Sequence, residues 1–155
     1  MAERILIENA INEKLTGETQ ANALDLIAFM RANEFLNEDG WEIYYKGEGI
    51  GCIDIAKIDS DKDEFWFWPS LGWDIDGNGS AYDELKEFAW AHVRICRQKK
   101  YCAGYCDASR NRWKIFGKEY ESTCHAPMSF TNPNANTVEN IKKLMLIIKQ
   151  NKVDV

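Results

Sequence analysis

The hydrophobic pattern of this chain changes period at Trp41, and this change constrains the fold more than any other feature. Before Trp41, apolar residues recur at helical spacing, which predicts two helices, at 3–15 and at roughly 18–33. After Trp41, apolar and polar residues alternate, which predicts three strands at 41–46, 50–58 and 64–68. Turn-forming residues at 47–49 and 59–63 separate these strands, so we expect an antiparallel three-stranded meander.

The predicted elements assign each side chain to a face. The first helix should bury Ile7, Ala10, Ile11 and Leu15, and the second should bury Ala23, Ile27 and Met30, with Leu24 and Leu26 beside them. In the middle strand, Gly51, Ile53 and Ile55 should point to one face, and Ile50, Cys52, Asp54 and Ala56 to the other.

The second half of the chain predicts further helices around a short strand region. Ser80 and Asp83 fit a capping box that begins a third helix at about 81–98. Its inward face should carry Leu85, Phe88, Ala89, His92, Val93 and Cys96. Residues 113–116 and 120–124 predict a hairpin that turns at 117–118, and 128–130 predicts one more strand.

A last helix is expected at about 137–150, where Asn136 and Glu139 fit a second capping box. Its core face should carry Val138, Ile141, Leu144, Met145 and Ile148. Residues 1–155 therefore predict a single α+β domain, because no repeat and no long linker divides the chain. We expect an antiparallel β-sheet, made of the three-stranded meander plus one to three further strands, covered by about four helices.

Charge and composition narrow the classes of function. The net charge of −6 argues against a nucleic-acid partner, because phosphate binding depends on clustered Lys and Arg. The first residues lack the apolar core of a signal peptide, and no apolar run is long enough to span a membrane. We therefore expect a cytoplasmic protein with reduced thiols and no membrane partner. The abundance of Asn, Lys and Ile hints at a bacterial source.

Four cysteines near the middle of the chain form the strongest chemical signal. Cys96, Cys102, Cys106 and Cys124 fall within 29 residues, beside the two histidines of the chain, His92 and His125. Cys102 and Cys106 have the spacing of a zinc-ligand pair, so the four cysteines predict a structural zinc site that would hold the loop at 101–112 against the sheet. His92 is an alternative ligand, because His92 and Cys96 share a face of the predicted third helix.

Two other interpretations of the cysteines remain open. Cys96 lies on the apolar face of the third helix, and free cysteine is among the most buried residue types, so the cysteines can serve as packing residues. A thiol-dependent enzyme or redox sensor would instead use Cys102 or Cys106, because the neighbouring basic residues Arg97, Lys99 and Lys100 lower the pKa of a nearby thiol.

An aromatic strand provides a second candidate site. Along 64–68, Phe65 and Phe67 should face one way, and Trp66 and Trp68 the other. Aromatic side chains on both faces line either a covered core or a small-molecule groove. If the site is a groove, we expect Trp66, Trp68 and the mid-strand Asp54 to contact the ligand.

Residues 74–79 (DIDGNG) match the first half of a calcium-binding loop, in which alternating oxygens converge and Gly permits a sharp turn. The match then fails, because the position that needs a bidentate Glu is Leu85. The alternative is a Gly-rich connection whose carboxylates face solvent near the start of the third helix.

The segment IFGKE at 115–119, followed by Cys124 and by FTNP at 130–133 before the last helix, resembles small uncharacterised bacterial α+β domains of unknown function. The resemblance covers about half of the chain. It implies a fold rather than an activity, and it carries over no functional residues.

Taken together, these patterns predict a non-enzymatic binding or accessory protein, stabilised by zinc at the four cysteines, whose partner is a small molecule or a protein. The alternatives are a thiol-dependent enzyme or redox sensor, and small-molecule binding at the aromatic face of the sheet.

Overall fold

The computed structural model describes residues 5–57, 61–69, 83–95, 112–121 and 123–153, and it has the predicted α+β fold. Its main sheet contains four antiparallel strands in the order β1-β2-β3-β8. The predicted meander is confirmed as β1 (Glu42–Tyr45), β2 (Glu48–Ala56) and β3 (Glu64–Pro69). The fourth strand, β8 (Phe130–Thr131), comes from the far end of the chain and pairs with β3.

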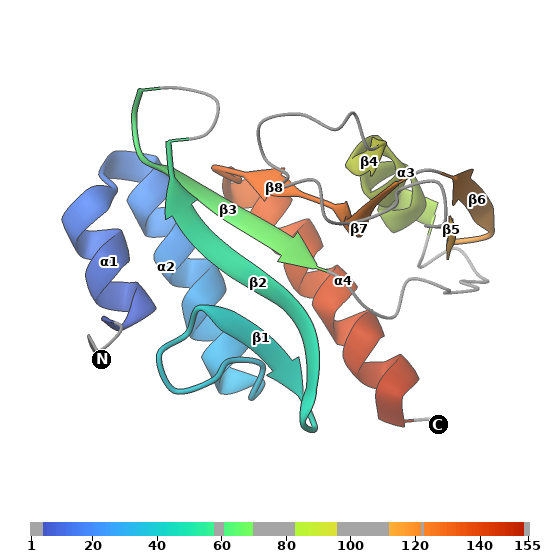
Figure 1. Cartoon of the computed structure of the whole chain (residues 1–155), viewed down its shortest axis with the longest axis horizontal. Helices are drawn as coiled ribbons and strands as arrows, with labels where there is room; N and C mark the ends of the chain where they lie inside the picture. The colour runs from blue at the N-terminus through green and yellow to red at the C-terminus, as the bar shows by residue number, and fades with distance from the viewer. Residues whose placement is uncertain (1–4, 58–60, 70–82, 96–111, 122, 154–155) are drawn as a thin grey trace.

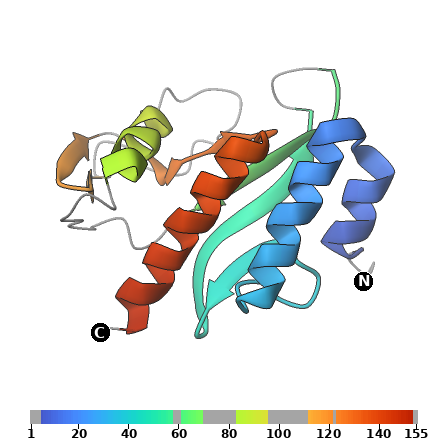
Figure 2. The same ribbon diagram turned by 180° about the vertical axis from the view of Figure 1, so that it is seen from behind.

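Three helices lie on one side of this sheet, as the front and back views show (Figures 1 and 2). They are α1 (Ile7–Lys14), α2 (Gly17–Ala32) and α4 (Ala135–Val153). The stripes predicted for them are buried: Ile7, Ala10, Ile11 and Leu15, then Ala23, Leu26, Ile27 and Met30, then Val138, Ile141, Leu144 and Met145. The side chain of Ile148 lies outside the described set. Within the part of the chain that the structure describes, no helix is long and apolar enough to cross a membrane.

The sheet contributes alternate residues to the same core. Ile53, Ile55, Phe65 and Phe67 are buried there together with the helix stripes, and Ile53 pairs with Phe67 while Ile55 pairs with Phe65. Because side chains alternate along a strand, Asp54, Trp66 and Trp68 must point away from the helices. The side of the sheet opposite α1, α2 and α4 is called the outer face below.

A β-bulge in β2 corrects one predicted orientation. Ile43 pairs with Gly51 but Tyr44 pairs with Gly49, so Ile50 is an extra residue between two pairs. Ile50 is buried in the core instead of sharing the outer face with Cys52 and Asp54. The bulge needs glycine at the next position, because a Cβ on Gly51 would lie 2.6 Å from the carbonyl oxygen of Trp68.

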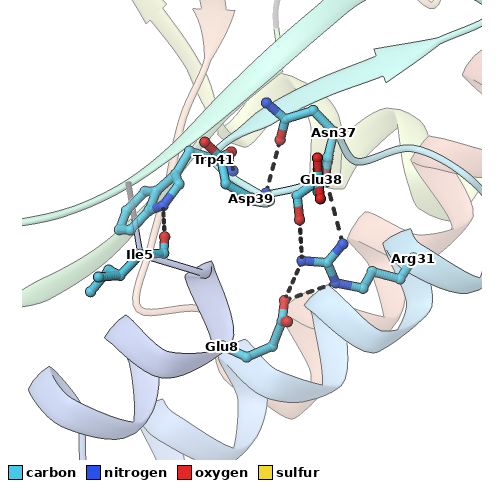
Figure 3. Close-up of polar contacts among 8 residues, drawn as sticks. Ile5, Glu8, Arg31, Asn37, Glu38, Asp39 and Trp41 are labelled. Carbon is cyan, nitrogen blue, oxygen red and sulfur yellow. Dashed lines mark hydrogen bonds and ion pairs between the residues drawn. The ribbon is translucent and has the colours of Figure 1, made fainter. Parts of the chain in front are cut away.

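The segment before β1 fastens the two N-terminal helices to the sheet (Figure 3). Arg31 of α2 forms an ion pair with Glu8 of α1, at 2.8 Å, and also donates to the carbonyl oxygens of Asn37 and Glu38. The indole Nε1 of Trp41 donates to the carbonyl oxygen of Ile5 at 2.7 Å. Residues that the chain separates widely are therefore held at the same corner of the fold.

Residues 35–37 of this segment also form hydrogen bonds with the free edge of β1, the edge that faces away from β2. The backbone N–H of Tyr44 donates to the carbonyl oxygen of Phe35 at 2.6 Å, and that of Asn37 donates to the carbonyl oxygen of Glu42 at 3.3 Å. Leu36 forms an isolated antiparallel bridge with Ile43. The edge strand of the sheet is therefore already paired along most of its length.

The rest of the described chain forms two small pairs of strands beside α3 (Asp83–Ala91) (Figure 1). β4 (Val93–Ile95) pairs with β7 (Thr123–Met128). The predicted continuation of the third helix to residue 98 is therefore wrong. The β-branched residues Val93 and Ile95 favour a strand, and β7 supplies the partner that the helical pattern could not indicate.

The predicted hairpin is confirmed as β5 (Arg112–Ile115) and β6 (Lys118–Glu121), but its turn lies one residue earlier than expected. Phe116 and Gly117 form this two-residue loop, with φ of 47° and 82°. Lys46 and Gly47 connect β1 to β2 in the same way, with φ of 52° and 81°. Two central residues with positive φ define the turn that matches the twist of paired strands.

The start of α4 differs from the predicted capping box. Asn134, not Asn136, accepts a hydrogen bond from the N–H of Thr137, at 2.8 Å. Just before it, the Oδ1 atom of Asn132 accepts a hydrogen bond from the N–H of Phe65, while the N–H of Asn132 donates to the carbonyl oxygen of Phe65. Asn132 therefore extends the pairing of β8 with β3 by one residue before the chain turns into α4.

Candidate functional site

The predicted zinc ligands fall largely outside the described residues. Cys96, Cys102 and Cys106 lie there, and of Cys124, which belongs to β7, only the backbone is described. Among the residues that the structure describes, no three His, Cys, Asp or Glu side chains converge as metal ligands. The zinc site stays a prediction, as does the reactive thiol at Cys102 or Cys106. Metal analysis of protein purified without a polyhistidine tag would test the zinc site.

The structure corrects the reason given for His92 as an alternative ligand. Because α3 ends at Ala91, His92 and the position four residues later do not share a helix face. Its ring Nδ1 lies 2.8 Å from the carbonyl oxygen of Phe88 and must donate to it. The ring also packs against Phe88 and Phe130, with centroids 4.6 and 4.8 Å apart. His92 therefore packs between α3 and β8, and its role as an alternative metal ligand stays a prediction.

The calcium-like loop at 74–79 also lies outside the described residues. The aromatic site is different, because β2 and β3 are described throughout. We therefore take the outer face of the main sheet as the candidate functional site.

The register of β2 and β3 brings together the three residues that the sequence predicts to contact a ligand. Asp54 pairs directly with Trp66, and Cys52 pairs with Trp68. Side chains of directly paired residues lie on the same face, about 5 Å apart at Cβ. Asp54, Trp66 and Trp68 are therefore neighbours on the outer face, as predicted from strand alternation.

The two tryptophans form a stack. Their ring centroids are 5.4 Å apart and their planes are inclined by 15°. Trp66 is buried, with 3% of its surface exposed, whereas Trp68 is partly exposed. The accessible aromatic surface of this pair is therefore the ring of Trp68, which is stacked against the buried ring of Trp66. A ring held in this way has little freedom to lose when a ligand packs against it.

Strand β1 extends the outer face with groups that the sequence pattern did not single out. Glu42 pairs with Cys52, and the hydroxyl of Tyr44 donates a 2.7 Å hydrogen bond to Oε2 of Glu42. This hydrogen bond, with the negative charge of Glu42, raises the pKa of the Tyr44 phenol above its ordinary value of 10.0. The alternation of Ile43 and Tyr45 toward the core was the available signal for placing Glu42 and Tyr44 here.

Cys52 lies between these groups, and its side chain is exposed. It is the fifth cysteine of the chain, outside the predicted zinc cluster. Its short side chain separates the carboxylate of Glu42 on β1 from the indole of Trp68 on β3. The outer face thus carries carboxylates and an aromatic ring on three neighbouring strands.

The comparisons with known proteins add no assignment. No protein-family model, no curated protein and no solved structure matches this chain. The candidate site is therefore interpreted from its own geometry and chemistry.

Proposed function

We propose that this protein is a binding domain that holds a small-molecule ligand on the outer face of its main sheet, against the ring of Trp68. The observation that carries the proposal is the Trp66–Trp68 stack with Asp54 directly across from Trp66. Small-molecule sites commonly combine an aromatic surface with a few polar groups that orient the ligand.

The exposure of these residues supports the same function. Side chains placed only for packing would be covered, as Phe65 and Phe67 are on the helix side of the same strand. Trp68 is partly exposed, and Asp54, Cys52 and Tyr44 are exposed. A face that presents a supported indole and polar groups to solvent is suited to contact with a ligand rather than to stabilising the fold.

The test is a screen of small molecules against the isotope-labelled protein, with binding followed by changes in backbone amide shifts and indole fluorescence. We expect ligands that shift resonances of β2 and β3. Trp68→Ala should weaken their binding by about tenfold or more, since aromatic stacking contributes roughly 1–3 kcal/mol per contact.

Tyr120→Ala is the matched control, because Tyr120 is a partly buried aromatic residue on the separate β5–β6 hairpin. It should leave ligand affinity unchanged. If the ligands found bind equally well to Trp68→Ala, or if their shifts map to the β5–β6 hairpin, the ligand site is elsewhere and the proposal is wrong.

A further inference from the structure

We propose that the ligand of the outer face is a small organic ammonium ion. This inference rests on the proposed function and specifies the chemistry of its ligand. It is carried by the combination, on one face, of an accessible indole and carboxylates, in strands that contain no Lys or Arg.

The charges of the main sheet are all of one sign. Its strands β1, β2, β3 and β8 contain Glu42, Glu48, Asp54 and Glu64, and no position in them is Lys or Arg. Glu42 alternates with the buried Ile43, and Asp54 alternates with the buried Ile53 and Ile55, so both carboxylates lie on the outer face, which is also the face with the accessible indole.

Two carboxylates lie on the same face as Trp68 and can attract a cation toward it. Asp54 is exposed and is two residues from Cys52 on the same face of β2, while Glu42 lies across from Cys52 on β1. One oxygen of Asp54 accepts the N–H of Ile55, and one oxygen of Glu42 accepts the Tyr44 hydroxyl. A carboxylate has about four acceptor positions, so both groups retain capacity for a ligand.

The aromatic ring decides which kind of cation fits. Ammonium groups are attracted to the face of an indole, and the attraction is stronger for Trp than for Tyr or Phe. A metal ion would instead need several converging oxygen, nitrogen or sulfur ligands, and the described residues hold no such group of three. An organic ammonium uses both features of this face: the indole for its alkyl groups and positive charge, and Asp54 and Glu42 for long-range attraction.

The test compares choline with 3,3-dimethyl-1-butanol, which has the same shape and hydroxyl group but no charge. Binding is followed by Trp fluorescence and by amide shifts, up to roughly 50 mM, because a ligand on a partly exposed ring buries only part of its surface and is expected to bind weakly. We expect choline to bind several times more tightly than its neutral analogue. Raising the ionic strength from about 100 mM to about 1 M, kept constant through each titration with added salt, should weaken choline binding alone.

Asp54→Asn should weaken choline binding by about two- to fivefold and leave the neutral analogue unaffected. Glu13→Gln is the matched control, because Glu13 is an exposed carboxylate on α1, on the helix side of the sheet. It should change neither ligand. Both variants replace a solvent-exposed side chain, so both should fold.

The possible failures are distinguishable. Equal binding of choline and the neutral analogue, with loss of both in Trp68→Ala, would overturn the charged ligand but keep the ligand site. Absence of saturable choline binding, or equal effects of Asp54→Asn and Glu13→Gln, would also overturn the inference. The screen against Trp68→Ala tests the proposed function separately.

Discussion

The helix-covered face of the main sheet carries Ile53, Phe65 and Phe67, whereas the outer face carries Asp54, Trp66 and Trp68 from the same two strands. Both faces are rich in aromatic residues. They differ in what surrounds the rings: Phe67 is packed against Phe130 and the helices, while Trp68 is stacked on Trp66 and partly open to solvent. The comparison teaches that aromatic content alone does not identify a core, and that accessibility and neighbouring charge separate a packing face from a binding face.

The largest expected difference between the two faces is in stability. Phe67→Ala should lower the free energy of unfolding by about 3–5 kcal/mol, because it removes a fully buried ring from the core. Trp68→Ala, at the next position, should cost less than about half as much, since part of its ring is already in water. Urea unfolding of both variants measures this. Equal losses would show that the outer face is as much a core as the other.

A smaller loss of stability is expected at the bulge in β2, where the alternation of side chains between the two faces is interrupted. Gly51→Ala should destabilise the protein by roughly 2–4 kcal/mol, because the new methyl group would meet the backbone of Trp68 and Pro69. Gly47→Ala should cost only about 1–2 kcal/mol, since Gly47 also has a positive φ but has open space around it.

Thermal or urea unfolding of the two glycine variants separates backbone strain from the close approach. If both variants lose the same stability, the contact between β2 and the Trp68 backbone is unimportant. Gly51→Ala should also disturb Trp68 and weaken any ligand that Trp68 binds, whereas Gly47→Ala should not.

The smallest effect concerns the electrostatics of the outer face. Glu42→Gln should lower the pKa of Tyr44 toward its ordinary value, because the carboxylate favours the protonated phenol by accepting its hydrogen bond and repels the phenolate. The sign follows from the charge: removing a negative group makes deprotonation easier. Titration of the Tyr44 ring carbon by NMR measures this change. A Tyr44 pKa unchanged in Glu42→Gln, or lowered equally by Glu13→Gln, would contradict the local origin of the shift.

Periodicity allowed much of the main sheet and its helices to be predicted. The stripes of α1, α2 and α4 follow the helical period, and Trp66, Trp68 and Asp54 follow from strand alternation. What could not be predicted depends on pairing between distant segments. Ile50 enters the core through a bulge that forms only against β1, and α3 ends where β4 meets a strand about 30 residues later.

The remaining site residues illustrate the same limit. Glu42 and Cys52 belong to the candidate site because the register of β1 and β2 sets them side by side. A single sequence shows which residues of each strand share a face. It does not show which residues of two neighbouring strands are paired when a bulge shifts the register. The four cysteines differ from Glu42 and Cys52 in this respect. They are conspicuous in the sequence, but their positions relative to one another depend on segments outside the described residues.

The pairing of residues 35–37 along the outer edge of β1 has a consequence for self-association. An open strand edge is a template on which a second chain can add a strand, and this is a common route to aggregation and to peptide capture. Here the carbonyl oxygen of Glu42 and the N–H of Tyr44 are already bonded within the chain. Growth of the sheet through β1 would require the segment anchored by Arg31 and Trp41 to be displaced first, so a strand-shaped partner is disfavoured at the edge next to the proposed ligand site.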